Sequence, residues 1–297
     1  PLPFLYPIYK SNQRSLFKIR CGMWLYSWLA RQSSLPSHQV LSTADILSRY
    51  PSLKSDQLLG GMHYYDAQMQ DLELVLANIN TAKKQGLIAH ENMTVTQLLK
   101  DSNQCCGVIA QQNKQDYVFH APCVLNVTGP WCNEINKLDN CKTDPLVAPT
   151  KGVHITVPSL GLDTALTLES PLDQRIFFMI PWEKNTLIGT TDTPFDGNPN
   201  SIKIDNHDIS YLLDSANYYL TNICLKNADI LNRFVGLRPL QYSQNSPSSR
   251  TRDYSLFASK SGLVHLYGGK YTAYRLMAEK AVDFIINHYH DSKTLKS

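Results

Sequence analysis

The chain has 297 residues, of which 43% are hydrophobic and 18% are charged, and its formal net charge at pH 7 is +3. This length allows one large domain or two, with a substantial core. The small charge, without a Lys/Arg run or an RNA-binding signature, excludes nucleic acid from the expected partners. The seven cysteines form no CxxC pair. We therefore expect neither a metal site nor a disulfide framework, and a reduced, cytoplasmic setting.

The first predicted helix covers residues 16–31 and is rich in apolar side chains. Trp24, Leu25 and Trp28 share one broad side of this helix, and basic residues flank it. The pattern fits a buried helix of a substrate domain, which is the commoner case. It also fits an interfacial helix that lies on a membrane surface.

Two further helices and several short strands follow. Helix 42–50 takes Ser42 or Thr43 as its N-cap, and helix 71–85 has an acidic start, a basic end and Gly86 just beyond it. Runs of β-forming residues separated by polar turns predict strands at 87–89, 94–99, 106–110, 117–120 and 123–127.

The second half of the chain is richer in strands. A hairpin is predicted with strands 176–180 and 186–189 joined by turn 181–185, because two β-rich runs flank a short polar segment. The other predicted elements are strands 151–157, 166–168 and 263–267, a helix at 207–223 capped by Asp205 or Asn206, and a long C-terminal helix after Gly268-Gly269.

The sequence lacks the glycine-rich motifs that bind nucleotides. The fourteen glycines contain no G-x-G, so neither a dinucleotide-binding fingerprint nor a phosphate-binding Walker loop is present. The chain also opens at Pro1-Leu2-Pro3 rather than at a methionine. We expect it to be the middle of a longer protein.

Five segments together resemble the FAD-dependent, quinone-linked glycerol-3-phosphate dehydrogenases. They are RIFFMIPWEKNTLIGTTDTPFDGNP (175–199), VLNVTGPWCNEI (124–135), KGVHITVP (151–158), GLRPL (236–240) and GGKYTAYR (268–275), with TRDY (251–254) as a further match. They cover most of this chain but only the middle of that family, without its N-terminal ADP-binding unit and its C-terminal helical domain.

The resemblance implies an α/β fold made of two interleaved parts. One is a partial FAD-binding domain of the glutathione-reductase type without its first βαβ unit, and the other is an α+β substrate-binding domain. The implied division gives residues 1–65 and 148–235 to the substrate domain, and residues 66–147 and 236–297 to the FAD domain.

The implied reaction oxidises glycerol 3-phosphate to dihydroxyacetone phosphate, with FAD as the hydride acceptor and quinone as the final acceptor. Guanidinium groups bind phosphate in a bidentate manner, so Arg238 and Arg252 are the expected phosphate ligands. Thr190 and Thr191 are expected to contact the substrate as well. Lys270, with Arg238, is expected to act in catalysis by polarising the substrate hydroxyl.

Two segments are expected to contact FAD. Glycines before a helix let a flat molecule approach the backbone, and the helix N-terminus offers unpaired N–H groups and partial positive charge. A plain strand-to-helix turn is the structural alternative. The residues that the resemblance assigns to FAD are Thr128, Gly129, Trp131, Gly268, Gly269, Lys270, Tyr271 and Thr272. The resemblance also implies peripheral contact with the inner face of the cytoplasmic membrane.

Two other functions stay open at this point. The chain can be another flavin oxidase of the same superfamily, such as an amino-acid oxidase, because one fold hosts many oxidations. It can also be a non-catalytic or split fragment that needs a complementary N-terminal chain with the ADP-binding unit. For the same reason we expect the 297-residue chain alone to bind FAD weakly or not at all, since it lacks the glycine loop that holds the pyrophosphate.

Overall fold

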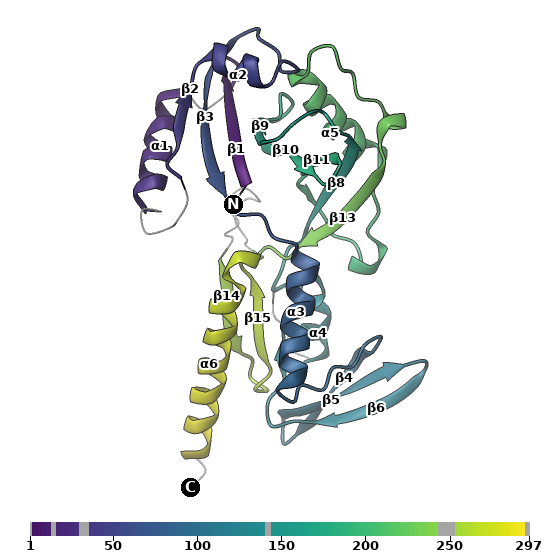
Figure 1. The fold of residues 1–297 in the computed structure, drawn as a ribbon. Helices are drawn as coiled ribbons and strands as arrows, with labels where there is room; N and C mark the ends of the chain where they lie inside the picture. The colour runs from purple at the N-terminus through teal and green to yellow at the C-terminus, as the bar shows by residue number, and fades with distance from the viewer. Residues whose placement is uncertain (1, 13–15, 30–35, 140–143, 243–252, 295–297) are drawn as a thin grey trace. The chain divides into compact units, whose positions relative to one another are not determined.

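The computed structural model describes residues 2–12, 16–29, 36–139, 144–242 and 253–294 (Figure 1). The chain divides into two compact units, each built from three separate segments. The first comprises Pro1–Ala82, Gly152–Asp192 and Lys203–Gly236, and the second comprises Lys83–Lys151, Thr193–Ile202 and Leu237–Ser297.

A large mixed sheet forms the first unit. Its strands lie in the order β8-β11-β10-β9-β1-β3-β2, and β13 also pairs with β8. Their bounds are β1 Leu2–Tyr9, β2 Gln39–Leu41, β3 Leu58–Asp66, β8 Thr150–Pro158, β9 Ala165–Glu169, β10 Ile176–Trp182, β11 Asn185–Gly189 and β13 Asn232–Arg238. Of these, β1, β2, β3 and β13 were not predicted.

Strand β1 was missed because prolines are rare inside strands. It carries Pro3 and Pro7, yet it pairs along its whole length with β3. Its parallel pairing with β9 is limited to Phe4 and Leu5, between the two prolines. The sheet therefore accommodates the prolines by keeping the β9 contact short.

The predicted hairpin is confirmed, with a tighter turn than expected. β10 and β11 pair from Phe178↔Gly189 to Trp182↔Asn185, so Pro181 and Trp182 belong to a strand and not to the turn. Only Glu183 and Lys184 remain in the loop. Glu183 has a φ of 54°, which is the left-handed backbone that two-residue hairpin turns require.

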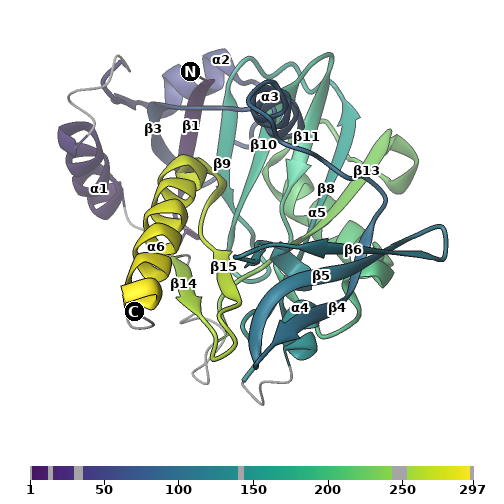
Figure 2. The same cartoon turned by 90° about the horizontal axis from the view of Figure 1, so that it is seen from below.

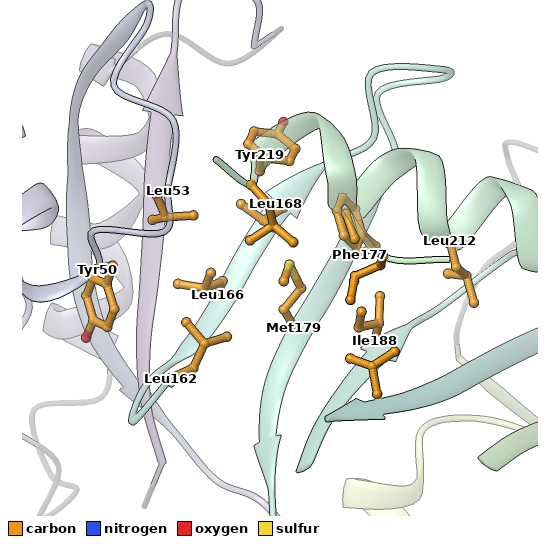
Figure 3. Close-up of a cluster of buried hydrophobic side chains, with 14 of the residues drawn as sticks. Tyr50, Leu53, Leu162, Leu166, Leu168, Phe177, Met179, Ile188, Leu212 and Tyr219 are labelled. Carbon is orange, nitrogen blue, oxygen red and sulfur yellow. The ribbon is translucent and has the colours of Figure 1, made fainter. Parts of the chain in front are cut away.

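Helix α5 (Asn206–Tyr219) packs on one face of the sheet. Asp205 caps it, as predicted, in a reciprocal capping box with Asp208. The helix ends four residues earlier than predicted because Leu220 is extended and bridges to Leu53. The buried cluster between helix and sheet includes Leu166, Leu168, Phe177, Met179, Ile188, Leu212 and Tyr219 (Figure 3).

Helix α1 (Leu16–Leu29) packs on the opposite face of β1 and β3. Tyr6 and Ile8 of β1 and Met62 of β3 form a small cluster there with Ile19 of α1. Successive side chains of a strand point to opposite faces, so β1 contributes to both cores. Helix α2 (Thr43–Arg49) begins at Ser42, which forms the predicted cap and a capping box with Asp45.

The second unit contains two three-stranded sheets. One has the order β4-β5-β6 and the other β14-β15-β7, in which β7 is parallel to β15. Helix α6 lies beside β14 and β15 in both Figure 1 and Figure 2. The bounds are β4 Thr94–Asp101, β5 Gln104–Gln112, β6 Gln115–His120, β7 Leu125–Asn126, α4 Cys132–Leu138, β12 Thr193–Pro194, β14 Tyr254–Ala258, β15 Val264–Gly268 and α6 Tyr274–Thr294.

Helix α3 (Asp71–Lys84) forms where it was predicted, but it has no buried residue. Its apolar side chains stay on the surface, with Leu72 70% exposed. The strand predicted at 87–89 is wrong: these residues form neither a strand nor a helix. The strand predicted at 123–127 shortens to β7. The α/β class with several sheets agrees with the sequence prediction.

Candidate functional site

The turn at Gly268-Gly269 is the centre of the candidate site. Both glycines have a φ of +78°, a conformation that other residues rarely adopt. A Cβ atom on Gly268 would lie 2.7 Å from the Asp253 carbonyl oxygen, and one on Gly269 would lie 2.6 Å from Met277 Sδ. The pair is therefore required by the protein's own packing as well as by backbone conformation.

The Asp253 carbonyl oxygen organises this turn. It accepts hydrogen bonds from the Gly269 N–H at 3.0 Å and from Gln241 Nε2 at 2.7 Å. Gln241 in turn bridges to Val147. Residues 241, 253 and 269 thus meet at one backbone atom.

A pocket of about 350 Å³ opens next to the turn. Lys270 lies at its mouth with an exposed side chain, at the N-cap of the short helix η5 (Tyr271–Ala273) that continues into α6. The Lys270 carbonyl accepts from Ala273 N at 2.9 Å. The lining residues are Asp253, Tyr254, Gly269, Lys270, Thr272 and Ala273.

The predicted FAD residues at this turn therefore lie together, and all belong to the second unit. Tyr271 is also there, 39% exposed, with its ring stacked on Tyr274 at 5.8 Å between centroids. Asp253, Tyr254 and Ala273 also line the pocket and were not predicted as site residues. Position 254 carried a signal, because it ends the quoted TRDY match.

The structure describes one of the two predicted phosphate ligands. Arg238 is the last residue of β13 and is half-buried, and its carbonyl accepts from Leu240 N at 2.9 Å. This hydrogen bond closes a three-residue turn centred on Pro239. Arg252 lies outside the described residues.

Thr190 and Thr191 belong to the first unit, directly after β11. Thr191 is buried, and its hydroxyl oxygen accepts from Val153 N at 2.9 Å. Thr190 Oγ1 donates to the Thr191 carbonyl at 3.0 Å. A Cβ on the preceding Gly189 would lie 2.0 Å from the His154 ring. Thr191 thus fastens the turn to β8, and Thr190 is the more accessible hydroxyl.

The other predicted cofactor segment follows β7. Thr128 and Gly129 start the short helix η1 (Gly129–Trp131), and Gly129 has a φ of +54° with open space where a side chain would be. The Trp131 ring is 42% exposed, and its Nε1 donates to Asn200 Oδ1 at 2.9 Å.

Buried polar side chains support this second turn. Asn126 is 3% exposed and His265 is fully buried, and they lie opposite each other in the β7–β15 pair. Burial lowers the pKa of His265 and raises the pKa of the Cys132 thiol to about 12. The imidazole and the thiol are therefore uncharged near neutral pH. No role was predicted for His265 or Cys132, because nothing in the sequence distinguishes them from core residues.

Metal and membrane signals are limited. Within the described ranges, no three His, Cys, Asp or Glu side chains gather closely enough to hold a metal ion. None of the helices that the structure describes has both the length and the apolarity needed to cross a bilayer.

Comparison with known proteins decides the family. Residues 3–275 match the family model described as FAD dependent oxidoreductase. The chain belongs to the FAD-dependent oxidoreductase family. FAD is accordingly the cofactor for which this fold is built. Gly269, without a side chain, forms part of the pocket wall beside Lys270.

Several relatives carry a more specific name. The chain is 33% identical to the mitochondrial glycerol-3-phosphate dehydrogenase of Macaca fascicularis over 98% of its length, and 34% identical to the Mycobacterium leprae glycerol-3-phosphate dehydrogenase over 95%. It spans 41% and 48% of those two proteins. The Bacillus halodurans glycerol-3-phosphate dehydrogenase, solved with FAD, matches with a TM-score of 0.81 and 28% identity, covering 97% of this chain and 52% of that one.

Proposed function

We propose that this chain is part of an enzyme that oxidises glycerol 3-phosphate to dihydroxyacetone phosphate. The observation that carries the proposal is the similarity to glycerol-3-phosphate dehydrogenases over nearly the whole chain. The pocket beside the exposed Lys270 supports it, because a cation there can pair with a substrate oxygen.

In this proposal the chain binds and orients the reactants. Arg238 and Arg252 hold the phosphate through charge-assisted hydrogen bonds, and Thr190 adds a neutral one. The Lys270 ammonium donates to the C2 oxygen, which favours transfer of the hydroxyl proton to water as the hydride leaves C2. When bound, FAD supplies the acceptor for the hydride that leaves C2, and quinone is the final acceptor.

The residues that would hold FAD come from two turns of the second unit. The first is Gly268-Gly269 with Lys270, Tyr271 and Thr272, and the second is Thr128-Gly129 with Trp131. We further propose that an ADP-binding βαβ unit, on the same polypeptide or a partner chain, completes the site. The apolar side chains that stay exposed on α6 support this proposal: Leu276, Val282 and Ile286 are each at least 50% exposed.

We also propose peripheral contact with a membrane, at the inner face of the cytoplasmic membrane. Helix α1 supports this, since Phe17 is 75%, Trp24 65%, Trp28 50% and Leu29 68% exposed. Lys18 and Arg20 on the same helix suit anionic lipid head groups. A membrane contact would bring the enzyme to its quinone.

Anaerobic mixing of the FAD-loaded protein with glycerol 3-phosphate tests the reaction. We expect the absorbance of the oxidised flavin to bleach and dihydroxyacetone phosphate to appear in equal amount. Bleaching by glycine, but not by glycerol 3-phosphate, would instead identify an amine oxidase. The 297-residue chain alone should lose FAD on gel filtration, and a chain that keeps one FAD would contradict the need for a completing unit.

A further inference from the structure

The side-chain amide of Asn126 is held in one orientation. Its Oδ1 accepts from the Thr128 N–H at 3.2 Å and from the Thr128 hydroxyl at 2.7 Å. A backbone N–H can only donate, so the atom that faces it must be the amide oxygen. The Asn126 Nδ2 group therefore points the other way.

That orientation fixes the tautomer of His265. Asn126 Nδ2 lies 3.1 Å from His265 Nδ1 and 3.2 Å from the Cys132 carbonyl. Because Nδ2 donates, Nδ1 must accept, and the ring proton lies on Nε2. His265 Nε2 is buried without a hydrogen-bond partner among the described residues. The Phe257 ring stacks on the imidazole at 5.1 Å between centroids and restricts its rotation.

The same network decides what Thr128 can offer to a ligand. Its N–H and its hydroxyl proton are both directed to Asn126 Oδ1, and its carbonyl accepts from Trp131 N at 3.1 Å. Thr128 is exposed, and because its hydroxyl proton is already donated, its hydroxyl oxygen can still act as an acceptor. A phosphate needs donors, whereas a sugar hydroxyl can donate to such an oxygen.

We propose that Thr128 is an acceptor that recognises a hydroxyl group of the cofactor, and that Asn126 and His265 are the positioning residues that keep it so. The ligand class is a ribose or ribityl hydroxyl, not a phosphate. The proposal rests on the proposed use of FAD and adds the role of this turn. Donation by Thr128 to a phosphate would break its 2.7 Å bond to buried Asn126.

Nuclear magnetic resonance tests the arrangement without any cofactor. Protein labelled with ¹⁵N at histidine, with His265→Gln to assign the signal, should show His265 protonated only on Nε2. Asn126→Asp removes the Nδ2 donor and should move the proton to Nδ1. A wild-type His265 that carries its proton on Nδ1, or on both nitrogens at pH 7, would overturn the proposed network.

The affinity for FAD and for analogues that lack one hydroxyl tests the recognition, in protein that holds this chain and its completing unit. Thr128→Val should weaken FAD binding about fivefold, the loss of one hydrogen bond, while Thr128→Ser and the exposed control Thr94→Val should not. One deoxy analogue, of the adenosine ribose or of the ribityl chain, should bind wild type and Thr128→Val equally.

Three results would separate the possibilities. If Thr128→Val binds FAD as wild type does, Thr128 is not a ligand. If it weakens FAD and every deoxy analogue alike, the lost contact is not to a hydroxyl. If wild-type protein binds no FAD, the proposed function fails together with this role of Thr128, whereas the tautomer measurement still decides the network.

Discussion

Lys270 is the residue on which the proposed chemistry depends most directly. It is exposed at the mouth of the pocket and lies before a helix, where the dipole disfavours a cation. A negative partner, such as a developing charge on substrate or cofactor, would explain why a cation is placed there. We therefore expect the Lys270 charge to contribute to the proposed reaction and not to the stability of the fold.

Replacing Lys270 with Met removes the charge and keeps the apolar stem. We expect flavin reduction in a single turnover to slow by about 10²-fold or more, as for loss of a positioned polar catalyst, with an unchanged free energy of unfolding. Lys280→Met is the control, since Lys280 is a surface residue whose ion pair with Asp283 is 3.9 Å long. An unchanged reduction rate in Lys270→Met would remove Lys270 from the active site.

Gly269, in contrast to Lys270, is expected to have a large effect on the stability of the fold. Gly269→Ala should destabilise the protein by about 1–3 kcal/mol, because the φ of +78° is strained for alanine and Met277 is too close. Adding Met277→Ala should recover part of that loss by relieving the contact. Gly22→Ala in helix α1, which meets no atom within 4 Å, should instead stabilise by about 1 kcal/mol. Urea denaturation measures all three.

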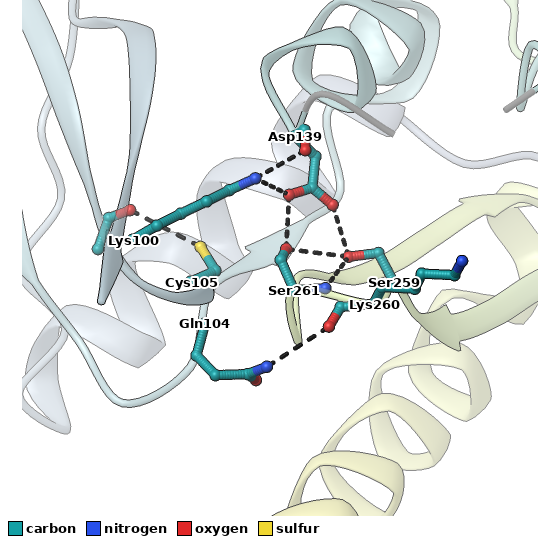
Figure 4. A network of polar contacts seen from close by, with 8 residues as sticks. Lys100, Gln104, Cys105, Asp139, Ser259, Lys260 and Ser261 are labelled. Carbon is teal, nitrogen blue, oxygen red and sulfur yellow. Dashed lines mark hydrogen bonds and ion pairs between the residues drawn. The ribbon is translucent and has the colours of Figure 1, made fainter. Parts of the chain in front are cut away.

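At the scale of elements, Asp139 at the end of α4 joins the pieces of the second unit (Figure 4). Its carboxylate accepts from Lys100 of β4 at 2.8 Å, and from Ser259 and Ser261 in the β14–β15 turn at 2.6 and 2.5 Å. The carboxylate is buried, and these donors compensate the hydration that its negative charge loses. One side chain thereby fixes a helix and two sheets to each other.

Asp139→Asn keeps the shape of the side chain and turns one acceptor into a donor. We expect a loss of about 3 kcal/mol in unfolding free energy, because donors are left facing an amide N–H₂ in a buried site. Asp283→Asn on the exposed side of α6 should change stability by less than about 0.5 kcal/mol. Equal effects of the two variants on urea midpoints would contradict the joining role.

Helix α1 gives a prediction about lipid binding. Trp24→Glu with Trp28→Glu should lower binding to anionic vesicles at least about tenfold, since burying one large apolar side chain contributes about 1.5–3 kcal/mol. Leu72→Glu on α3 is the matched control, because Leu72 is 70% exposed on another helix. Co-sedimentation measures the bound fraction. Equal binding by the double variant and wild type would exclude α1 as the contact.

For the whole molecule, two buried histidines predict how stability depends on pH. Burial lowers the pKa of His63 in the first unit and of His265 in the second below the ordinary 6.5. Below pH 6.5 the unfolded chain therefore binds more protons than the folded one, and stability falls as pH falls. The slope is at most about 1.4 kcal/mol per pH unit for each histidine.

Urea unfolding between pH 7.5 and about 5 measures this slope. His265→Gln and His63→Gln should each flatten it, whatever they do to stability at pH 7.5. A wild-type slope that stays the same in both variants would assign the acid sensitivity to other groups.

The sequence predicted best where local chemistry decides the structure. Ser42 and Asp205 cap their helices, and strands 176–180 and 186–189 pair, because each signal acts over a few residues. Strand β1 was not predicted because prolines disfavour a strand. Its strand structure depends on pairing with β3, which no local pattern shows. Likewise, no local pattern reveals that Asn126 and His265, 139 residues apart, become neighbours.

The carbonyl of Asp253 has a consequence for reading substitutions in this protein. This oxygen accepts hydrogen bonds from the Gly269 N–H and from the Gln241 side chain. Any amino acid at position 253 supplies the same main-chain oxygen. Variation at position 253 in a mutational scan therefore reports on the carboxylate and not on the oxygen that organises the turn. The importance of that oxygen would become visible only at its partners, where glycine is obligatory at 268 and 269 and an amide donor is needed at 241.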